Sequence, residues 1–174
     1  PCVAAIGNFD GVHRGHATVI AAAIDAARAK GVAAAAVTFD PHPREFFRHE
    51  GAPFHLADRA EKDRLLAALG LDRVIHVTFD DNLRCTDASA FVSNVLPALG
   101  VTDLFAGSDF AFGRGRGGDL DTINAIGSGI GISASAVSLM SDANSAVISS
   151  SRIRAALQAG EVEQAASMLG HDWA

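Results

Sequence analysis

The sequence has few cysteines, no strong excess of either charge and no long apolar run, and each absence excludes a class of protein. Cys2 and Cys85 form neither a CxxC pair nor a disulfide framework, so we expect two buried thiols and a reducing, cytoplasmic location. The net charge of -6 argues against a surface that binds DNA or RNA. No apolar run approaches the ~20 residues of a membrane-spanning helix. The N-terminus also lacks the regions of a signal peptide.

The chain has 174 residues, of which 49% are hydrophobic, and this suits one domain with a substantial core. Its acidic balance does not exclude a nucleotide ligand, because a few local donors can bind a phosphate inside an acidic protein. The sequence begins at Pro1, almost within an apolar run and without an initiator methionine. We therefore expect the natural polypeptide to be longer.

Short apolar runs alternate with helical patterns along the chain. The runs are Val3–Ile6, Val32–Phe39, Val74–Phe79, Asp103–Ala106 and Ile132–Val137. The helical patterns are Ala17–Lys30, Asp58–Leu69, Asp87–Leu99, Asp119–Ile126, 151–159 and 161–169. Runs that are apolar on both faces are typical of parallel strands buried between layers of helices. This order predicts an α/β fold with an open, doubly wound parallel sheet, whose ligand lies beyond the carboxyl ends of the strands.

The ends of the helical patterns carry the residues that helix ends prefer. Asp58, Asp87 and Asp119 stand where N-caps are expected. Gly31 directly follows the first helical pattern, as a C-terminal glycine does. These residues predict where the helices begin and end.

The first motif is Gly7–His16, read as GNFDGVHRGH, and it follows the first apolar run. A buried strand, a tight turn and a helix N-terminus together present backbone N–H groups and a positive dipole end to phosphates. On a first helical turn, His13 and His16 would share one face and donate hydrogen bonds to phosphate oxygens. Gly15 leaves the space between them free of a side chain, so that a phosphate can approach the backbone. The bland alternative is a tight turn with two surface histidines.

The second motif follows the second apolar run and reads TFDPHPR, from Thr38 to Arg44. Two prolines disfavour helix here and push the residues before them into extended geometry. Asp40 and His42 would then be displayed on a stiff loop at the carboxyl edge of the sheet. A proline-fixed connection with incidental polar groups is an equally good interpretation of these residues alone.

The third motif is Gly107–Gly113, read as GSDFAFG, which leads into a Gly/Arg stretch. Its glycines permit backbone close to a ligand, and its phenylalanines offer flat apolar surfaces. Asp109 would accept hydrogen bonds from a ribose or help to place a metal, while Arg114 and Arg116 would meet phosphate. The alternative is an ordinary mobile loop or a lid.

The fourth motif is Ile148–Arg154, read as ISSSRIR, which opens a helix. Its serines suit an N-cap, and that is one complete explanation. A helix start with hydroxyls, and with Arg154 one turn in beside Ser150, is also a site for an anion. We expect Arg152 to point elsewhere, into solvent.

Several other residues are expected to be structural. Phe46 and Phe47 are predicted to pack, and His49, His55 and His76 have no partner at ligand spacing. No zinc site and no covalent nucleophile can be assembled from the sequence.

Together the four motifs resemble one family, the adenylyltransferase module of the bacterial bifunctional riboflavin kinase/FMN adenylyltransferases, or FAD synthetases. The matching pieces follow the family order over nearly the whole chain: GNFDGVHRGH, TFDPHPRE, KDRLLAALG from Lys62 to Gly70, FDDNL with the later Phe91, GSDFAFGRGRGGD and ISSSRIRAALQAGEVEQAASMLG. His-x-Gly-His marks only the wider nucleotidyltransferase superfamily, whereas TFDPHP and GSDFAFG make the match specific. The resemblance implies a Rossmann-like HxGH nucleotidyltransferase fold, with residues 1–174 as a single FMN adenylyltransferase domain.

The resemblance also implies a reaction, in which FMN and Mg-ATP give FAD and pyrophosphate by direct in-line attack on the α-phosphorus. The catalytic residues it implies are His13, His16, Ser150 and Arg154. For ATP it implies Gly7, Asn8, Phe9, Gly15, Gly107, Asp109, Phe112 and Ser149. For FMN it implies Asp40, Pro41, His42, Pro43 and Asn82. Mg²⁺ would bridge phosphates, and no protein ligand is assigned to it.

Two departures from the family pattern are visible. Ser151 stands where threonine is usual, which keeps the hydroxyl. The chain stops at Trp173–Ala174, where the family continues into a C-terminal riboflavin kinase domain. We therefore expect that this chain does not phosphorylate riboflavin and that the full-length protein carries that partner domain.

Two rival functions stay open on the sequence. One is an adenylyl- or cytidylyltransferase of the same superfamily that acts on another phosphate or acid. The other is a non-catalytic flavin- or nucleotide-binding module. The presence of His13, His16 and Arg154 argues against the second, and a substrate panel separates the first.

Overall fold

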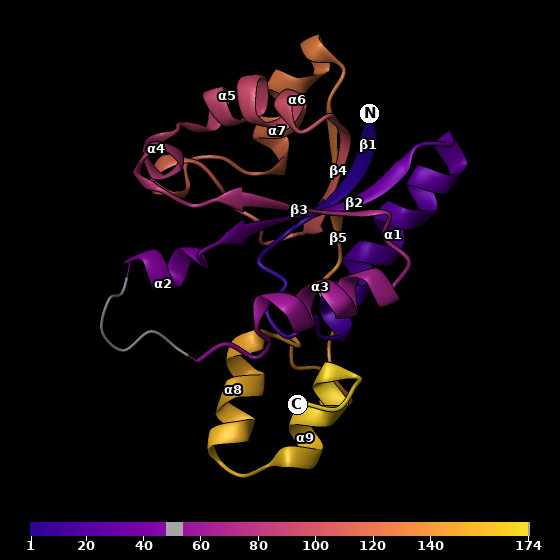
Figure 1. Cartoon of the computed structure of the whole chain (residues 1–174), viewed down its shortest axis with the longest axis vertical. Helices are drawn as coiled ribbons and strands as arrows, with labels where there is room; N and C mark the ends of the chain where they lie inside the picture. Colours follow the sequence, from indigo (N-terminus) through magenta and orange to yellow (C-terminus); the bar gives the residue numbers. More distant parts are fainter. Residues whose placement is uncertain (48–53, 174) are drawn as a thin grey trace.

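Five parallel strands form the central sheet of the computed structural model, which describes residues 1–47 and 54–173 (Figure 1). They are β1 (Cys2–Ile6), β2 (Ala33–Asp40), β3 (Arg73–Thr78), β4 (Val101–Gly107) and β5 (Ser133–Val137). Each predicted strand is confirmed, with ends that differ by at most two residues. The strand order is β3-β2-β1-β4-β5, so the order reverses beside β1. This is the predicted doubly wound topology, and its switch point lies between β1 and β4.

Helices connect the strands in the predicted places. The longer ones are α1 (Arg14–Lys30), α3 (Arg59–Ala68), α7 (Leu120–Gly127), α8 (Ser150–Gln158) and α9 (Val162–Leu169). The short ones are α2 (Pro43–Phe47), α4 (Asp81–Cys85), α5 (Ala88–Ala90), α6 (Leu96–Ala98), the π-turn η1 (Phe91–Val95) and the 3₁₀ turns η2 (Arg114–Arg116) and η3 (Ser128–Ile130). Within residues 1–47 and 54–173, no helix is both long and apolar enough to cross a membrane.

Helix caps confirm the predicted boundaries. The side chains of Asp58, Asp87 and Asp119 each accept a hydrogen bond of 2.8 Å from the backbone N–H three residues later. Gly31 closes α1 in the left-handed conformation. The predicted helix over Asp87–Leu99 is continuous but contains η1. It widens there directly before Pro97, which has no N–H to donate to the preceding turn.

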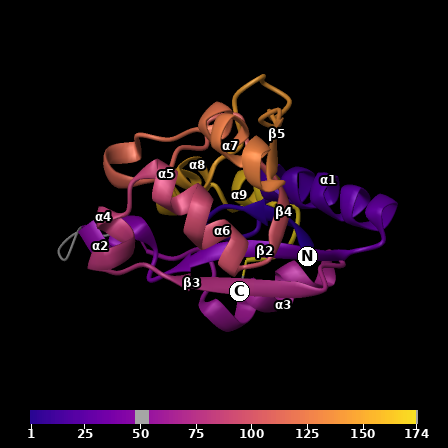
Figure 2. The ribbon, with the colours of Figure 1, turned by 90° about the horizontal axis from the view of Figure 1, so that it is seen from above.

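Alternate residues of β1 pack on opposite faces of the sheet, which helices cover on both sides (Figure 2). Ile6 belongs to a core cluster that includes residues of η1, α6 and α7. Val3 belongs to a second cluster that includes residues of α1 and α3. Burial on both faces explains why the strands read as continuous apolar runs.

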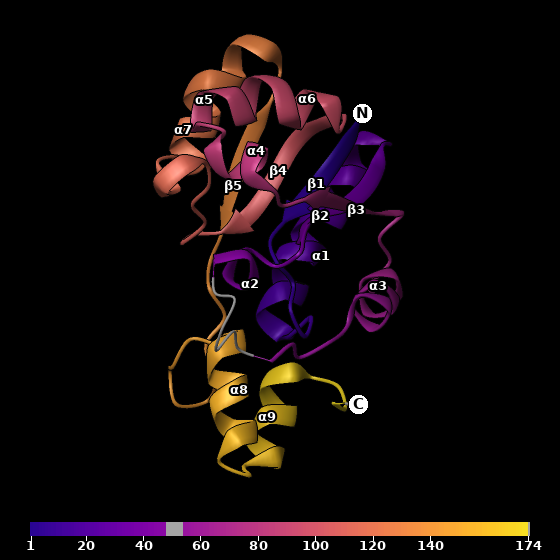
Figure 3. The same cartoon turned by 60° about the vertical axis from the view of Figure 1, so that its left-hand side comes forward.

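A third core cluster lies beyond the carboxyl ends of the strands, where α8 and α9 pair (Figure 3). It includes Leu56 and Ile148 together with apolar residues of both helices. The segment after α9 returns to the turn after β1, because His171 Nε2 lies 2.9 Å from the Gly11 carbonyl oxygen. Trp173 Nε1 donates to the Leu56 carbonyl at 2.8 Å. The α8–α9 pair is thereby packed against the segments that follow the carboxyl ends of the strands.

Two expectations are wrong. Pro43 does not exclude a helix but begins α2, because the first helical residue needs no donated N–H and proline's φ is already helical. Cys2 is buried as expected, and burial raises the pKa of its thiol, but Cys85 is exposed because it ends the short surface helix α4.

Candidate nucleotide-binding site

A cavity of about 770 Å³ opens at the carboxyl ends of the strands. All four sequence motifs contribute to its walls, through the turn after β1, the start of α2, the loop after β4 and the start of α8. The cavity therefore lies at the switch point that the strand order defines.

The turn from Gly7 to His13 is held in an unusual backbone conformation. Phe9, Gly11 and Val12 have φ values of 50°, 78° and 41°. Such values are unfavourable for Phe and Val and persist where packing enforces them, and both side chains are buried. A Cβ on Gly11 would lie 2.9 Å from the Leu56 Cβ, so this position also has no room for a side chain.

The turn places His13 and His16 side by side at the start of α1. Their rings stack with centroids 3.5 Å apart, and Phe9 contacts His16 edge-on. His13 is the N-cap rather than a residue of the first turn, because its Nδ1 accepts a hydrogen bond from the His16 backbone N–H at 3.3 Å. A Cβ on Gly15 would lie 3.2 Å from the His13 ring, which is why the spacing needs glycine there.

Both imidazoles are neutral at neutral pH. Burial lowers the pKa of His13 to about 4, against an opposing rise from the nearby carboxylate of Asp10. Burial, and then the neighbouring His13, hold the pKa of His16 well below its usual value. Because His13 Nδ1 is an acceptor, its proton is on Nε2. In this state His13 is a hydrogen-bond donor through Nε2–H and not a cation.

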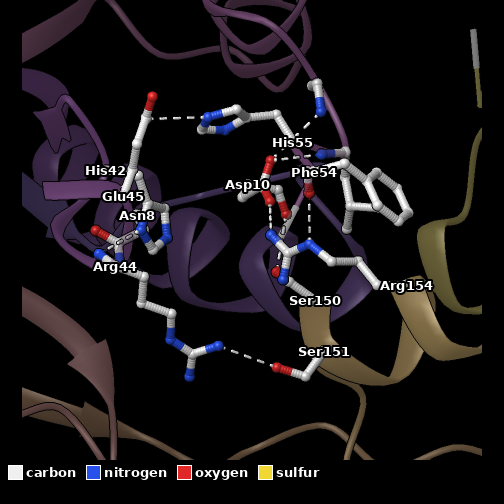
Figure 4. A network of polar contacts seen from close by, with 12 residues as sticks. Asn8, Asp10, His42, Arg44, Glu45, Phe54, His55, Ser150, Ser151 and Arg154 are labelled. Carbon is white, nitrogen blue, oxygen red and sulfur yellow. Dashed lines mark hydrogen bonds and ion pairs between the residues drawn. The ribbon is translucent and has the colours of Figure 1, made fainter. Parts of the chain in front are cut away.

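The start of α8 is joined to the same turn through Asp10 (Figure 4). Arg154 Nη2 forms a buried ion pair with Asp10 Oδ2, and Arg154 Nε donates to the Phe54 carbonyl at 2.7 Å. Ser150 Oγ donates to the Asp10 backbone carbonyl at 2.9 Å. Asp10 Oδ1 accepts from the backbone N–H groups of Leu56 and Ala57 at 3.0 and 3.3 Å.

Asp10 is therefore the residue that connects the first and fourth motifs, and the sequence analysis did not single it out. Asp10 and Arg154 are 4% and 7% exposed, so each neutralises a charge that would otherwise be buried alone. Arg154 Nη1 makes no hydrogen bond to any described residue, and Arg154 lines the cavity. The sequence does show a carboxylate, Asp10, in the first motif and an arginine, Arg154, in the fourth, and their opposite charges could have suggested an ion pair.

The second motif forms the opposite wall. His42 Nδ1 accepts from the Arg44 backbone N–H at 3.0 Å, and Arg44 Nη1 donates to Ser151 Oγ at 3.2 Å, which links α2 to α8 (Figure 4). Burial lowers the pKa of His42 to about 4. Phe47 also lines the cavity and is 60% exposed, so the expectation that it packs is wrong. Phe47 lies at the cavity edge, where it contacts Phe79 edge-on.

Two of the expected structural histidines do not line the cavity themselves and pair with carboxylates. His55 Nε2 lies 3.1 Å from Glu45, and His76 Nε2 lies 2.9 Å from Asp63. His49 lies outside the described residues.

The loop after β4 supplies the remaining wall. Phe110 and Phe112 stack with centroids 5.7 Å apart, and Asp109 is an exposed carboxylate at the cavity. Arg114 and Arg116 are exposed in η2 and also line the cavity. In the described part of the chain, no three His, Cys, Asp or Glu side chains gather closely enough to hold a metal ion. Asp10 is already paired with Arg154 and is not available as a metal ligand. The residues of the cavity therefore suit a metal ion that is bound mainly by the phosphates of a ligand, rather than one that is bound by protein side chains alone.

Comparison with known proteins shows which family has these motifs. Residues 1–152 match the FAD synthetase family. The chain belongs to this family. It is 40% identical over 170 residues to the bifunctional riboflavin kinase/FMN adenylyltransferase of Pseudomonas fluorescens, a match that covers 97% of this chain and 54% of that protein. It is 33% identical over 177 residues to the FAD synthetase of Listeria monocytogenes, covering 98% of this chain and 69% of that protein.

A solved structure also matches this member of the FAD synthetase family. The crystal structure described as that of a macrolide-efflux protein from Streptococcus pneumoniae has a TM-score of 0.87 and 25% sequence identity. It covers 99% of this chain and 56% of that chain. The chain thus spans about half the length of the Pseudomonas and Streptococcus proteins that it matches.

In this FAD synthetase family member, the structure brings most of the predicted site residues to one cavity. The lining includes His13, His16, Ser150 and Arg154, with Gly7, Asn8, Phe9, Gly15, Gly107, Asp109, Phe112 and Ser149. His42 and Pro43 line it as well, but Asp40, Pro41 and Asn82 do not. Asp40 turns away to pair with Arg59 at 2.8 Å, and Asn82 is exposed on α4. The assignment of these three residues to the flavin therefore stays a prediction.

Arg152 also departs from its expected place in solvent. Its guanidinium pairs with Asp142 at 2.6 Å and donates to two backbone carbonyls of the segment between β5 and α8. The reason is that this segment folds back beside the first turn of α8.

The buried histidines predict that stability falls in mildly acidic solution. In the unfolded chain His13, His16 and His42 become protonated near pH 6.5, whereas in the folded protein their pKa values are lower. Between pH 6.5 and about 4 the unfolded chain therefore binds more protons, and lowering the pH favours unfolding. For His13 alone, a pKa lowered from 6.5 to about 4 corresponds to about 3 kcal/mol. Urea unfolding at a series of pH values measures this loss. The His42→Gln variant should show a shallower dependence, and an unfolding free energy that is constant from pH 6.5 to 4.5 would contradict the prediction.

Proposed function

We propose that residues 1–174 form an FMN adenylyltransferase domain, which transfers AMP from Mg-ATP to FMN and yields FAD and pyrophosphate. One observation carries this proposal: the turn with His13 and His16 and the start of α8 are tied together by the Asp10–Arg154 pair at one cavity. The match of residues 1–152 to the FAD synthetase family supports the choice of reaction. The names of the Pseudomonas and Listeria relatives support the same choice.

The reaction needs positioning and charge neutralisation more than proton removal. A phosphate oxygen of FMN attacks the α-phosphorus of ATP, a new phosphorus–oxygen bond forms, and the bond to the β-phosphate breaks to release pyrophosphate. Since the attacking oxygen is already an anion, no strong general base is required. His13 and His16 act as neutral donors to the phosphates, which fits their lowered pKa values. Mg²⁺ bound to ATP would neutralise part of the phosphate charge.

The two substrates occupy opposite sides of the cavity in this proposal. The triphosphate lies between the histidine pair and the start of α8, where Ser149, Ser150 and the Nη1 of Arg154, which bonds no described residue, meet it. The flavin ring lies against α2, where Phe47 offers an exposed aromatic face beside Phe79. This arrangement brings the FMN phosphate towards the α-phosphate of ATP.

Chromatography of the purified chain incubated with FMN, ATP, Mg²⁺ and pyrophosphatase tests the proposal. We expect FAD to appear. A panel in which other phosphate acceptors replace FMN tests for another transferase of the same superfamily. Tight binding of FMN and ATP without turnover would instead indicate a binding module, and both outcomes would overturn the proposed reaction.

We also propose that the natural protein is cytoplasmic and continues into a C-terminal riboflavin kinase domain. The low cysteine content supports the location. The name and greater length of the Pseudomonas relative support the second domain.

Phe47→Ala should weaken FMN binding selectively. Loss of one aromatic contact corresponds to about 0.5–1.5 kcal/mol, so we expect the KM for FMN to rise by about 2- to 10-fold while the KM for ATP stays unchanged. Steady-state FAD formation at varied FMN measures this. The matched control is Phe46→Ala, because Phe46 also contacts Phe79 but does not line the cavity. Equal effects of the two substitutions would contradict the assignment.

A further inference from the structure

The segment between β5 and α8 is a small hairpin with a tightly bonded tip. Ser141 and Val147 form an antiparallel bridge, and the Ile148 N–H donates to the Met140 carbonyl at 2.8 Å. At the tip, Asp142 Oδ1 accepts from the backbone N–H groups of Asn144 and Ala146 at 2.9 and 3.0 Å. These bonds set the shape of the tip but do not attach the hairpin to the rest of the molecule.

Arg152 bonds the hairpin tip to the first turn of α8, in addition to the Thr18–Met140 contact with α1 and the packing of Ile148 in the third core cluster. Its Nη2 donates to Asp142 Oδ2 at 2.6 Å, and its Nη1 donates to the carbonyls of Ala146 and Val147 at 3.0 and 2.7 Å. One planar guanidinium thus bonds both sides of the hairpin tip, which a lysine with a single nitrogen cannot reproduce. The hydrogen bond from Arg152 holds the pKa of Asp142 below its usual range, so the pair is ionised at neutral pH.

The other side of the same hairpin lines the cavity. Leu139 and Val147 are each 40% exposed and belong to the cavity wall, on the side of β4 and β5. Leu139 lies over the end of β4, since a Cβ on Gly107 would come within 3.1 Å of its Cδ2. When a flat apolar group of a ligand covers apolar side chains in a cavity, the burial of apolar surface lowers the free energy of the complex. Phe47, on the proposed flavin side, lies across the cavity on the β2 side.

We infer that Arg152 is a positioning residue, which holds the hairpin over residues 139–148 against α8 so that Leu139 and Val147 form the apolar wall for the base of the nucleotide. The inference rests on the proposed function for the identity of the nucleotide as ATP. Arg152 contacts the hairpin and not the substrate, whereas Ser150 and Arg154, from the same turn of α8, reach the cavity. A single helical turn therefore positions the phosphate site and the base wall together.

The test compares Arg152→Met and Arg152→Lys with the unaltered chain. Equilibrium titrations with Mg-ATP and with FMN are made separately, so that the inference is tested even without turnover. Loss of these hydrogen bonds should weaken ATP binding by about tenfold in both variants, with FMN binding unchanged within about twofold. In FAD formation the KM for ATP should rise in the same proportion, and kcat should change little.

Two further variants separate positioning from general stability. Arg64→Met removes an arginine that pairs with Glu61 on the surface of α3, and it should leave both affinities unchanged. Asp142→Asn removes the charge of the partner, and combining it with Arg152→Met should add little to the effect of Arg152→Met alone. Unchanged ATP affinity in Arg152→Met would overturn the inference, as would equal weakening of ATP and FMN. Absence of FAD from the unaltered chain would count against the proposed function, and the ATP titration would still decide the role of Arg152.

Discussion

His16→Ala should lower kcat/KM for FAD formation by about 10²- to 10³-fold, as the loss of one donor to a developing oxyanion does in other enzymes. The reason is the position of His16, stacked on His13 with ring centroids 3.5 Å apart and held neutral by burial. Its N–H is aimed by packing before the substrate arrives, so its loss removes stabilisation of the transition state rather than of the fold. Initial rates at subsaturating ATP and FMN measure the effect.

Two variants sharpen this result. His16→Asn keeps an N–H donor and should retain more activity than His16→Ala. His76→Gln changes a histidine that pairs with Asp63 and does not line the cavity, so its rate should match that of the unaltered chain. If His16→Ala turned over within threefold of the unaltered chain, the proposed role of the histidine pair would be wrong.

Arg154→Met should lower the free energy of unfolding by about 3–5 kcal/mol, the range seen when one partner of a buried ion pair is removed. Asp10 is 4% exposed, and without the guanidinium its carboxylate would be buried with two backbone N–H groups as its only partners among the described residues. Urea unfolding at pH 7 measures the change.

The double variant Asp10→Asn with Arg154→Met separates the charge from the packing. It leaves no isolated buried charge, so it should be more stable than Arg154→Met alone. Arg64→Met removes an exposed ion pair and should change the free energy of unfolding by about 0–1 kcal/mol. If Arg154→Met unfolded within 1 kcal/mol of the unaltered chain, the Asp10–Arg154 pair would not hold the two motifs together. Asp10→Asn and Arg154→Met, each made alone, should also abolish most FAD formation, because the phosphate site loses its shape.

Features set by neighbours in the chain could be predicted from the sequence. The strands follow from short apolar runs, because burial on both faces allows no polar alternation. The caps at Asp58, Asp87 and Asp119 were predictable for a similar reason, since each aspartate bonds a backbone N–H only three residues away. The contact between His13 and His16 is also local, since both lie at the start of one helix.

Features that depend on distant partners could not be predicted in this way. Phe47 is exposed at a cavity edge, although its pattern is that of a packing residue, because its exposure depends on where the tertiary structure places α2. Arg152 bonds a hairpin whose fold the sequence did not reveal. Asp40 pairs with Arg59 of α3, a partner 19 positions away that its motif does not indicate.

The sequence by itself determined the α/β class, the strand positions and the four segments that reach the ligand edge of the sheet. These depend on periodicity and turn chemistry, which act over a few residues. Only the tertiary structure decided that Asp10 and Arg154, 144 positions apart, share one buried pair. Burial is a property of the whole fold, and it determines whether a charged side chain stays in water or must find a partner.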